Sequence, residues 1–248
     1  MFEQCLIYLA IFFVALLYSS VGHGGASGYL AVLSIFGFIP SEMALSALIL
    51  NLLVSAVSFI AFRSTGNFKF KLFWPFALSS IPFSFLGGLL PISAKVYNIL
   101  LSSILIFAAY RLIQFNGKIN QLEKKKEFSV FLALVLGGTI GFISGLIGIG
   151  GGIFLSPILI LSGWAEVKEA ASISALFIWV NSTAGILGRY SHATPIVYGS
   201  LLPLIISAFL GGLVGSRFGA TQWSQVTLRR LLGFVLLIAA FKLFYISF

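Results

Sequence analysis

The sequence contains no aspartate, one cysteine and two histidines, and only 8% of its residues are charged. Its acidic residues are six glutamates, which fall near the amino terminus, in a central polar stretch or at the edges of apolar segments: Glu3, Glu42, Glu123, Glu127, Glu166 and Glu169. No carboxylate pair is therefore placed inside an apolar segment, where it could perform acid–base catalysis or hold a divalent cation. We expect neither an enzyme nor a bound metal or cofactor.

The few thiol and imidazole groups exclude further classes. A single cysteine, Cys5, cannot form an intramolecular disulfide or a CxxC redox pair. The two histidines, His23 and His192, are not spaced as metal ligands, and no Ser-His-acid set can be named around them. His192 is expected in a surface loop.

Apolar residues dominate what is present. The chain is 59% hydrophobic over 248 residues, with a mean hydropathy of +1.09, which indicates an integral membrane protein. Its apolar segments cover residues 5–21, 26–39, 44–62, 72–91, 96–115, 128–147, 153–163, 170–188, 195–215 and 228–247. A membrane-spanning helix needs about 20 residues. Segments 26–39 and 153–163 are short for this, and whether they span or re-enter is left open.

Each short segment directly follows a cluster of glycines. The first cluster includes Gly22, Gly24 and Gly25, and the second runs from Gly148 to Gly152. Glycine lowers helix preference by about 1 kcal/mol per residue, so both clusters predict a break in an apolar helix. Unwound backbone is tolerated in a bilayer only where protein covers it or where it lines a polar cavity, and paired breaks are therefore a candidate binding site. The alternative is that the glycines only let helices pack closely.

The two clusters belong to an internal repeat. At an offset of 126 residues, Gly22, Gly24 and Gly25 align with Gly148, Gly150 and Gly151. The same offset aligns Ala44 with Ala170, Ser46 with Ser172 and Arg63 with Arg189, and after a small shift Phe85-Leu86-Gly87-Gly88-Leu89 matches Phe209-Leu210-Gly211-Gly212-Leu213. We therefore divide the chain into an N-terminal membrane repeat (1–115), a polar linker (116–127) and a C-terminal membrane repeat (128–248).

Basic residues orient the two halves. Eleven of them fall in the linker and in the loops expected on its side of the membrane: Arg63, Lys69, Lys71, Lys118, Lys124, Lys125, Lys126, Lys168, Arg217, Arg229 and Arg230. The loops of the other side hold only Lys95 and Arg189, while Arg111 and Lys242 lie in helix ends. The positive-inside rule then predicts a cytoplasmic linker and halves of inverted topology. Parallel halves, with an even number of crossings each, are the alternative.

The net charge of +9 is accounted for by membrane orientation and lipid headgroups, so no nucleic-acid partner is expected.

The breaks point to an anion as ligand. Backbone N–H groups at a helix start bind anions, and the predicted helices beginning just after Gly25 and Gly152 would both aim their positive ends at the interior. Nearby hydroxyls and amides would complete the site. Our candidate substrate-binding residues are Gly22, His23, Gly24, Gly25, Ser27, Ser46, Asn51, Gly148, Gly150, Gly151, Gly152, Ser172, Ser174 and Asn181.

His23 is the titratable side chain expected inside the membrane. Its unperturbed pKa near 6.5 would let it carry a proton alongside an anion or donate a hydrogen bond to one. The alternative is a histidine that only binds a neighbouring backbone group at the helix break.

The glycine run 148–152 with Pro157, the stretch Ala170-Ala171-Ser172-Ile173-Ser174-Ala175 leading to Asn181-Ser182, and the weaker first copy together resemble the TauE/SafE sulfite-exporter family. The resemblance covers essentially the whole chain and implies an all-α, multi-pass secondary transporter of small anions such as sulfite or organosulfur compounds. The resemblance also implies a location in the bacterial inner membrane. Expected partners are a small anion, membrane lipid and a coupled proton, with a homo-oligomer left open. The other function considered is a membrane scaffold or assembly protein.

Overall fold

The computed structural model describes residues 2–64, 68–113, 127–190, 198–219, 236–238 and 240–245, and this part of the chain is helical throughout, apart from its connections. Its helices are α1 (Phe2–Ser19), α2 (Ala26–Ile35), α3 (Pro40–Arg63), α4 (Phe70–Leu89), α5 (Ala94–Ile113), α6 (Val130–Ile147), α7 (Gly152–Leu161), α8 (Val167–Arg189) and α9 (Tyr198–Gly219). Residues 236–238 and 240–245 are helical as well. The predicted all-α class is confirmed.

The predicted apolar segments coincide with these helices to within a few residues. The polar linker except for its last residue, the loop that holds His192, and the pair Arg229 and Arg230 lie outside the described residues. Arg189, which was expected in a loop, is instead the last residue of α8. That expectation was wrong because Arg189 has hydrogen-bond partners inside the protein, described below, which make a partly buried helical position favourable for it.

Five described helices are long and apolar enough to cross a membrane: α3, α4, α6, α8 and the part of α9 from Leu201 to Phe218. Their outward faces carry large apolar side chains such as Ile60, Phe131 and Leu187, which are 61–77% exposed and suit a lipid-facing surface. The short helices α2 and α7 have 10 residues each. At 1.5 Å per residue each is about 15 Å long, half the hydrocarbon thickness of a bilayer.

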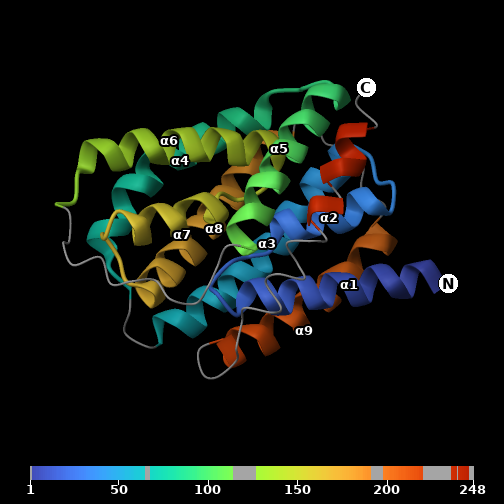
Figure 1. Cartoon of the computed structure of the whole chain (residues 1–248), viewed down its shortest axis with the longest axis horizontal. Helices are drawn as coiled ribbons and strands as arrows, with labels where there is room; N and C mark the ends of the chain where they lie inside the picture. Colours follow the sequence, from blue (N-terminus) through green and yellow to red (C-terminus); the bar gives the residue numbers. More distant parts are fainter. Residues whose placement is uncertain are drawn as a thin grey trace.

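The long helices pack in two pairs around a central pair. Figure 1 shows α4 and α6 along one edge of the molecule and α1 and α9 along the opposite edge, with α3 packed against α8 between them. Glycines allow the backbones of the two helices in each outer pair to approach each other closely. Gly141 and Gly145 of α6 abut the backbone carbonyls of Ser80 and Ser84, and Gly211 of α9 in the same way abuts the carbonyl of Phe12. Small residues let membrane helices approach in this manner, so part of the chain's glycine content serves packing.

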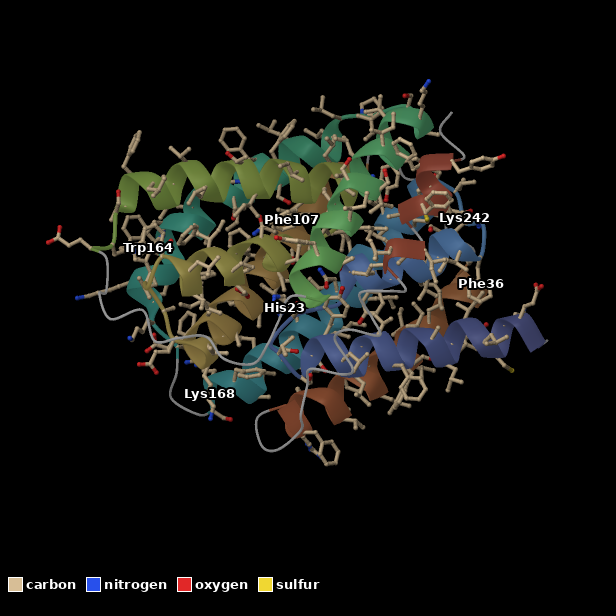
Figure 2. All side chains as sticks on the ribbon, viewed as in Figure 1. His23, Phe36, Phe107, Trp164, Lys168 and Lys242 are labelled. Carbon is tan, nitrogen blue, oxygen red and sulfur yellow. The ribbon has the colours of Figure 1, made fainter. Side chains whose placement is uncertain are left out.

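The two short helices are built alike and run in opposite directions. Each is followed two residues later by a glycine, and the N–H groups of this glycine and of the next residue donate to carbonyl oxygens of the last turn. Gly37 and Phe38 donate to Ser34 and Leu33, and Gly163 and Trp164 donate to Ile160 and Leu159. In Figure 2, Phe36 and Lys242 lie toward one end of the long axis and Trp164 and Lys168 toward the other, with His23 between them. Thus α2 and α7 lead from the middle of the molecule to opposite ends.

Candidate functional site

The two glycine breaks meet at Asn51, a fully buried residue in the middle of α3. A Cβ added to Gly24 would collide with the side-chain oxygen of Asn51, and one added to Gly150 would collide with its side-chain nitrogen. Gly152 faces His23, since a Cβ on this glycine would lie 3.5 Å from the Cδ2 atom of the histidine. The structure therefore brings together stretches that are 126 residues apart in the sequence.

Both breaks expose the start of a short helix. Gly25 precedes α2 and Gly151 precedes α7, each in the left-handed backbone region with φ of +102° and +82°. Glycine adopts this region readily, which explains its presence at both positions. Within the part of the chain that the structure describes, neither helix start has a side-chain cap. The first N–H groups of a helix have no partner within the helix, so these two starts offer donors and a partial positive charge to a ligand.

Asn51 ties the second break to the rest of the protein. Its Nδ2 donates hydrogen bonds to the carbonyl oxygen of Ile149, at 3.2 Å, and to Oγ of Ser182, at 3.3 Å. Both amide hydrogens are thereby used, and the side-chain oxygen is buried without a hydrogen-bond partner among the described residues. In this conformation Asn51 positions the break rather than offering a donor to an anion.

Two residues on α8 complete the meeting point, and neither was among our candidates. Ser182 is fully buried, and its Oγ lies 3.0 Å from the position of a Cβ on Gly150. Ile178, one turn earlier, covers both breaks, because a Cβ on Gly24 or on Gly150 would lie 3.1 Å from its Cγ2. Their spacing of four residues, together with Asn181-Ser182 in the family motif, is the signal that would have identified this face of the helix.

The other polar candidates on α3 and α8 are buried, but none of them is among the nearest neighbours of the break glycines. Ser172 and Ser174 are fully buried in α8; the Oγ of Ser172 has no hydrogen-bond partner in the described part of the chain, whereas Ser174 shares a hydrogen bond of 2.7 Å with Ser156 of α7. Asn181 donates to the carbonyl oxygen of Phe177 one turn earlier, at 2.8 Å. Ser46 is buried in α3.

The first break is lined by tyrosines. Ser27 and Tyr18 share a buried hydrogen bond of 2.7 Å, and the hydroxyl of Tyr29 donates to the carbonyl oxygen of Gly24 at 2.8 Å. His23 is partly exposed, and its Nδ1 lies 3.1 Å from the carbonyl oxygen of Val21, so this nitrogen carries the donated hydrogen. The imidazole therefore has the local backbone contact expected at a helix break.

Packing also fixes the outer ends of both breaks. A Cβ on Gly22 would lie 2.6 Å from the Cβ of Ala171, and one on Gly148 would lie 2.8 Å from the carbonyl oxygen of Ala44. These two glycines serve close contact between the first half and the second half of the chain. They do not face Asn51.

The end of α6, immediately before the second break, is held by side chains from two other helices. Arg189 Nη2 donates to the carbonyl oxygens of Gly145 and Leu146, and the Tyr97 hydroxyl donates to that of Ile147 at 2.9 Å. The carbonyl of Ser144 accepts the N–H groups at the break itself. All four carbonyls that a helix leaves unsatisfied at its C-terminus are thus paired.

Within the described residues, no group of three or more His, Cys, Asp or Glu side chains could hold a metal ion. The one ion pair found there joins Lys69 to Glu169 at the start of α8, outside the breaks. The functional groups gathered at the breaks are backbone N–H groups, hydroxyls and amides.

Comparison with known proteins agrees with this architecture. The family described as Sulfite exporter TauE/SafE matches residues 7–243. The chain belongs to this family. The resemblance noted from the glycine run is confirmed, and with its five candidate spans this TauE/SafE member is a multi-pass integral membrane transporter.

Curated relatives of this TauE/SafE protein come from bacteria and archaea. A probable membrane transporter protein of Sinorhizobium fredii is 34% identical over 242 residues, covering 96% of each chain. Others with the same description occur in Methanocaldococcus jannaschii, 27% identical over 83% of this chain and 84% of the relative, and in Bacillus subtilis, 25% identical over 86% and 89%. The search of solved structures gave no match.

Proposed function

We propose that this protein is a secondary transporter that moves a small anion, sulfite or an organosulfur anion, across the membrane by alternating access. The observation that carries the proposal is the meeting of the two glycine breaks at Asn51, each of them directly before a helix start without a side-chain cap among the described residues. Family membership supports the class of substrate.

Electrostatics favour an anion at this place. Each helix start carries about half a positive charge, and two such ends near each other in a medium of low dielectric repel. None of the described glutamates lies in the breaks, where a carboxylate would offset that charge. A small anion would accept hydrogen bonds from the free N–H groups and relieve the repulsion.

Alternating access requires two halves that can exchange roles, and an inverted repeat provides them. The pairings of α4 with α6 and of α9 with α1, together with α2 and α7 running to opposite ends, support an inverted repeat over 1–115 and 128–248. Lys168 and the salt-bridged Lys69 belong to the basic face, which we place in the cytoplasm together with the linker 116–127. The membrane would be the bacterial inner membrane, and His23 is the group we assign to a coupled proton.

A scaffold or assembly protein is the second candidate. Gly22 and Gly148, which pack against Ala171 and Ala44, favour it, since they use their small size for contact alone. The buried oxygens of Ser172, Asn51 and Asn181 have no partner among the described residues, and this favours transport instead, because a packing device gains nothing from polar groups without partners.

Transport assays separate the two candidates. Proteoliposomes that contain the full chain should take up or release labelled sulfite or an organosulfonate. A matched experiment with sodium or potassium ions and no permeant anion should show no flux of these cations. Asn51→Ala would disconnect the second break from α3 and α8 and should reduce transport at least tenfold. Flux in none of a panel of sulfur oxyanions and organosulfonates would contradict the proposed function.

A further inference from the structure

The two breaks differ in what their hydroxyl groups do. At the second break, Ser144 is fully buried, and its Oγ has no hydrogen-bond partner among the described residues. This hydroxyl faces the start of α7, because a Cβ on Gly151 would lie 2.7 Å from it. A buried hydroxyl without a hydrogen-bond partner is energetically unfavourable, so its presence at a helix start points to a ligand that supplies the missing hydrogen bond.

Ser182 offers a second donor at the same place. Its Oγ accepts the hydrogen bond of Asn51, and no donated bond from this hydroxyl is found within the described part of the chain. The hydroxyl hydrogen is thus left for another acceptor near Gly150, which lies directly against it. Ser144 and Ser182 approach the start of α7 from two helices, α6 and α8.

The first break is closed in the corresponding positions. Tyr18, which aligns with Ser144 at the repeat offset, already shares its hydroxyl with Ser27. The ring of Tyr29 fills the space over Gly25, where a Cβ would lie 2.8 Å from Cζ and from the hydroxyl oxygen. The unpartnered side-chain oxygen of Asn51 also faces Gly24, and an acceptor oxygen there repels an anion.

We propose that the anion binds at the start of α7, held by the first N–H groups of that helix and by the hydroxyls of Ser144 and Ser182, and that the start of α2 is its structural counterpart without a bound ion. This proposal rests on the proposed function and restricts the anion-binding site to the second of the two repeats. Donors that converge from three elements suit a sulfite or sulfonate group, whose three oxygens accept hydrogen bonds separately.

The test uses the purified full chain in lipid nanodiscs and measures sulfite binding by calorimetry, with thermal unfolding of each variant recorded without ligand. Ser144→Ala and Ser182→Ala should each raise the Kd for sulfite about tenfold, the effect of losing one hydrogen bond to a charged group. Ser144→Ala should unfold at the same temperature as the parent or above it, since it removes a buried unsatisfied group.

Two matched variants serve as controls. Ser34 is also buried, and its hydroxyl has no partner among the described residues, but it lies at the far end of α2, so Ser34→Ala should leave the Kd within twofold. Tyr29→Phe removes the hydroxyl bonded to Gly24 at the first break and should lower the unfolding temperature while also leaving the Kd within twofold.

The outcomes separate the two proposals. A parent protein that neither binds nor transports any sulfur oxyanion overturns the proposed function. A parent that binds sulfite, together with Ser144→Ala and Ser182→Ala variants that bind it equally well, overturns the assignment to α7 alone. A Tyr29→Phe variant that weakens sulfite binding as much as Ser144→Ala does also overturns the assignment to α7 alone.

Discussion

Replacing Gly151 by alanine tests the architecture of the second break, and the chain contains a matched control. Gly151 precedes α7 with φ of +82°, and Gly37 follows α2 with φ of +81°. An added Cβ at Gly151 would lie 2.7 Å from both Ile140 Cγ2 and Ser144 Oγ and 2.8 Å from Phe177 Cε1. At Gly37 it would meet no atom of the described residues within 4 Å. The two substitutions therefore share the same backbone change and differ in packing.

The expected stabilities follow from this difference. A left-handed conformation costs an alanine roughly 1–2 kcal/mol, and both variants lose that amount. Gly151→Ala also overpacks a buried position, at about 1–3 kcal/mol. For a chain of this length 1 kcal/mol corresponds to about 2–4 °C, so Gly151→Ala should unfold roughly 2–12 °C below Gly37→Ala.

The measurement is thermal unfolding of both variants in the same detergent, followed by sulfite flux in proteoliposomes per correctly folded protein. Gly37→Ala should transport like the parent, whereas the methyl group of Gly151→Ala stands beside the first N–H groups of α7 and should abolish flux. Combining Gly151→Ala with Ser144→Ala should recover part of the lost stability, because it removes one of the three close contacts. Equal unfolding temperatures for Gly151→Ala and Gly37→Ala would refute the packing described around this break.

Three further predictions address other parts of the molecule. Arg189→Met leaves two carbonyls at the end of α6 without a donor and should destabilise the protein by about 1–3 kcal/mol for each, so a variant that unfolds at the parent's temperature would contradict the pairing. Ile178→Ala should cost about 2–5 kcal/mol but raise flux of bulky organosulfonates relative to sulfite, and an unchanged ratio would show that Ile178 does not limit the site. Single cysteines introduced at Asn120 and Ser247 in a Cys5→Ser background should label from opposite faces of the membrane, whereas labelling from one face would exclude the inverted arrangement.

Local sequence signals predicted much of the fold. Apolar runs gave the helices to within a few residues, and the glycine clusters gave the two breaks, because helix preference and chain reversal depend on nearby residues. The predicted start of α2 after Gly25 is confirmed, and α7 begins at Gly152, one residue earlier than predicted.

The details of the site depend on distant contacts and could not be predicted in this way. Asn51 was expected as a ligand, but its amide hydrogens are taken by Ile149 and Ser182, about 100 and 130 positions further along the chain. The rotation of α8 that brings Ile178 and Ser182 to the breaks is set by packing, including the bond from Ser84 to the carbonyl of Asn181. The four-residue spacing of Ile178 and Ser182 places both on one face of α8, but it does not indicate which neighbour that face meets.

The pairing of α4 with α6 and of α1 with α9 has a consequence for synthesis of the protein. When the ribosome has completed the first half, the faces of α1 and α4 that pack against α9 and α6, and the amide of Asn51, still lack the neighbours that cover them in the finished molecule. Because these contacts join residues from about 60 to about 200 positions apart in the sequence, their formation must wait for later helices to enter the bilayer. The first half alone should accordingly be a short-lived proteolysis substrate, while the two halves expressed as separate polypeptides should protect each other from degradation.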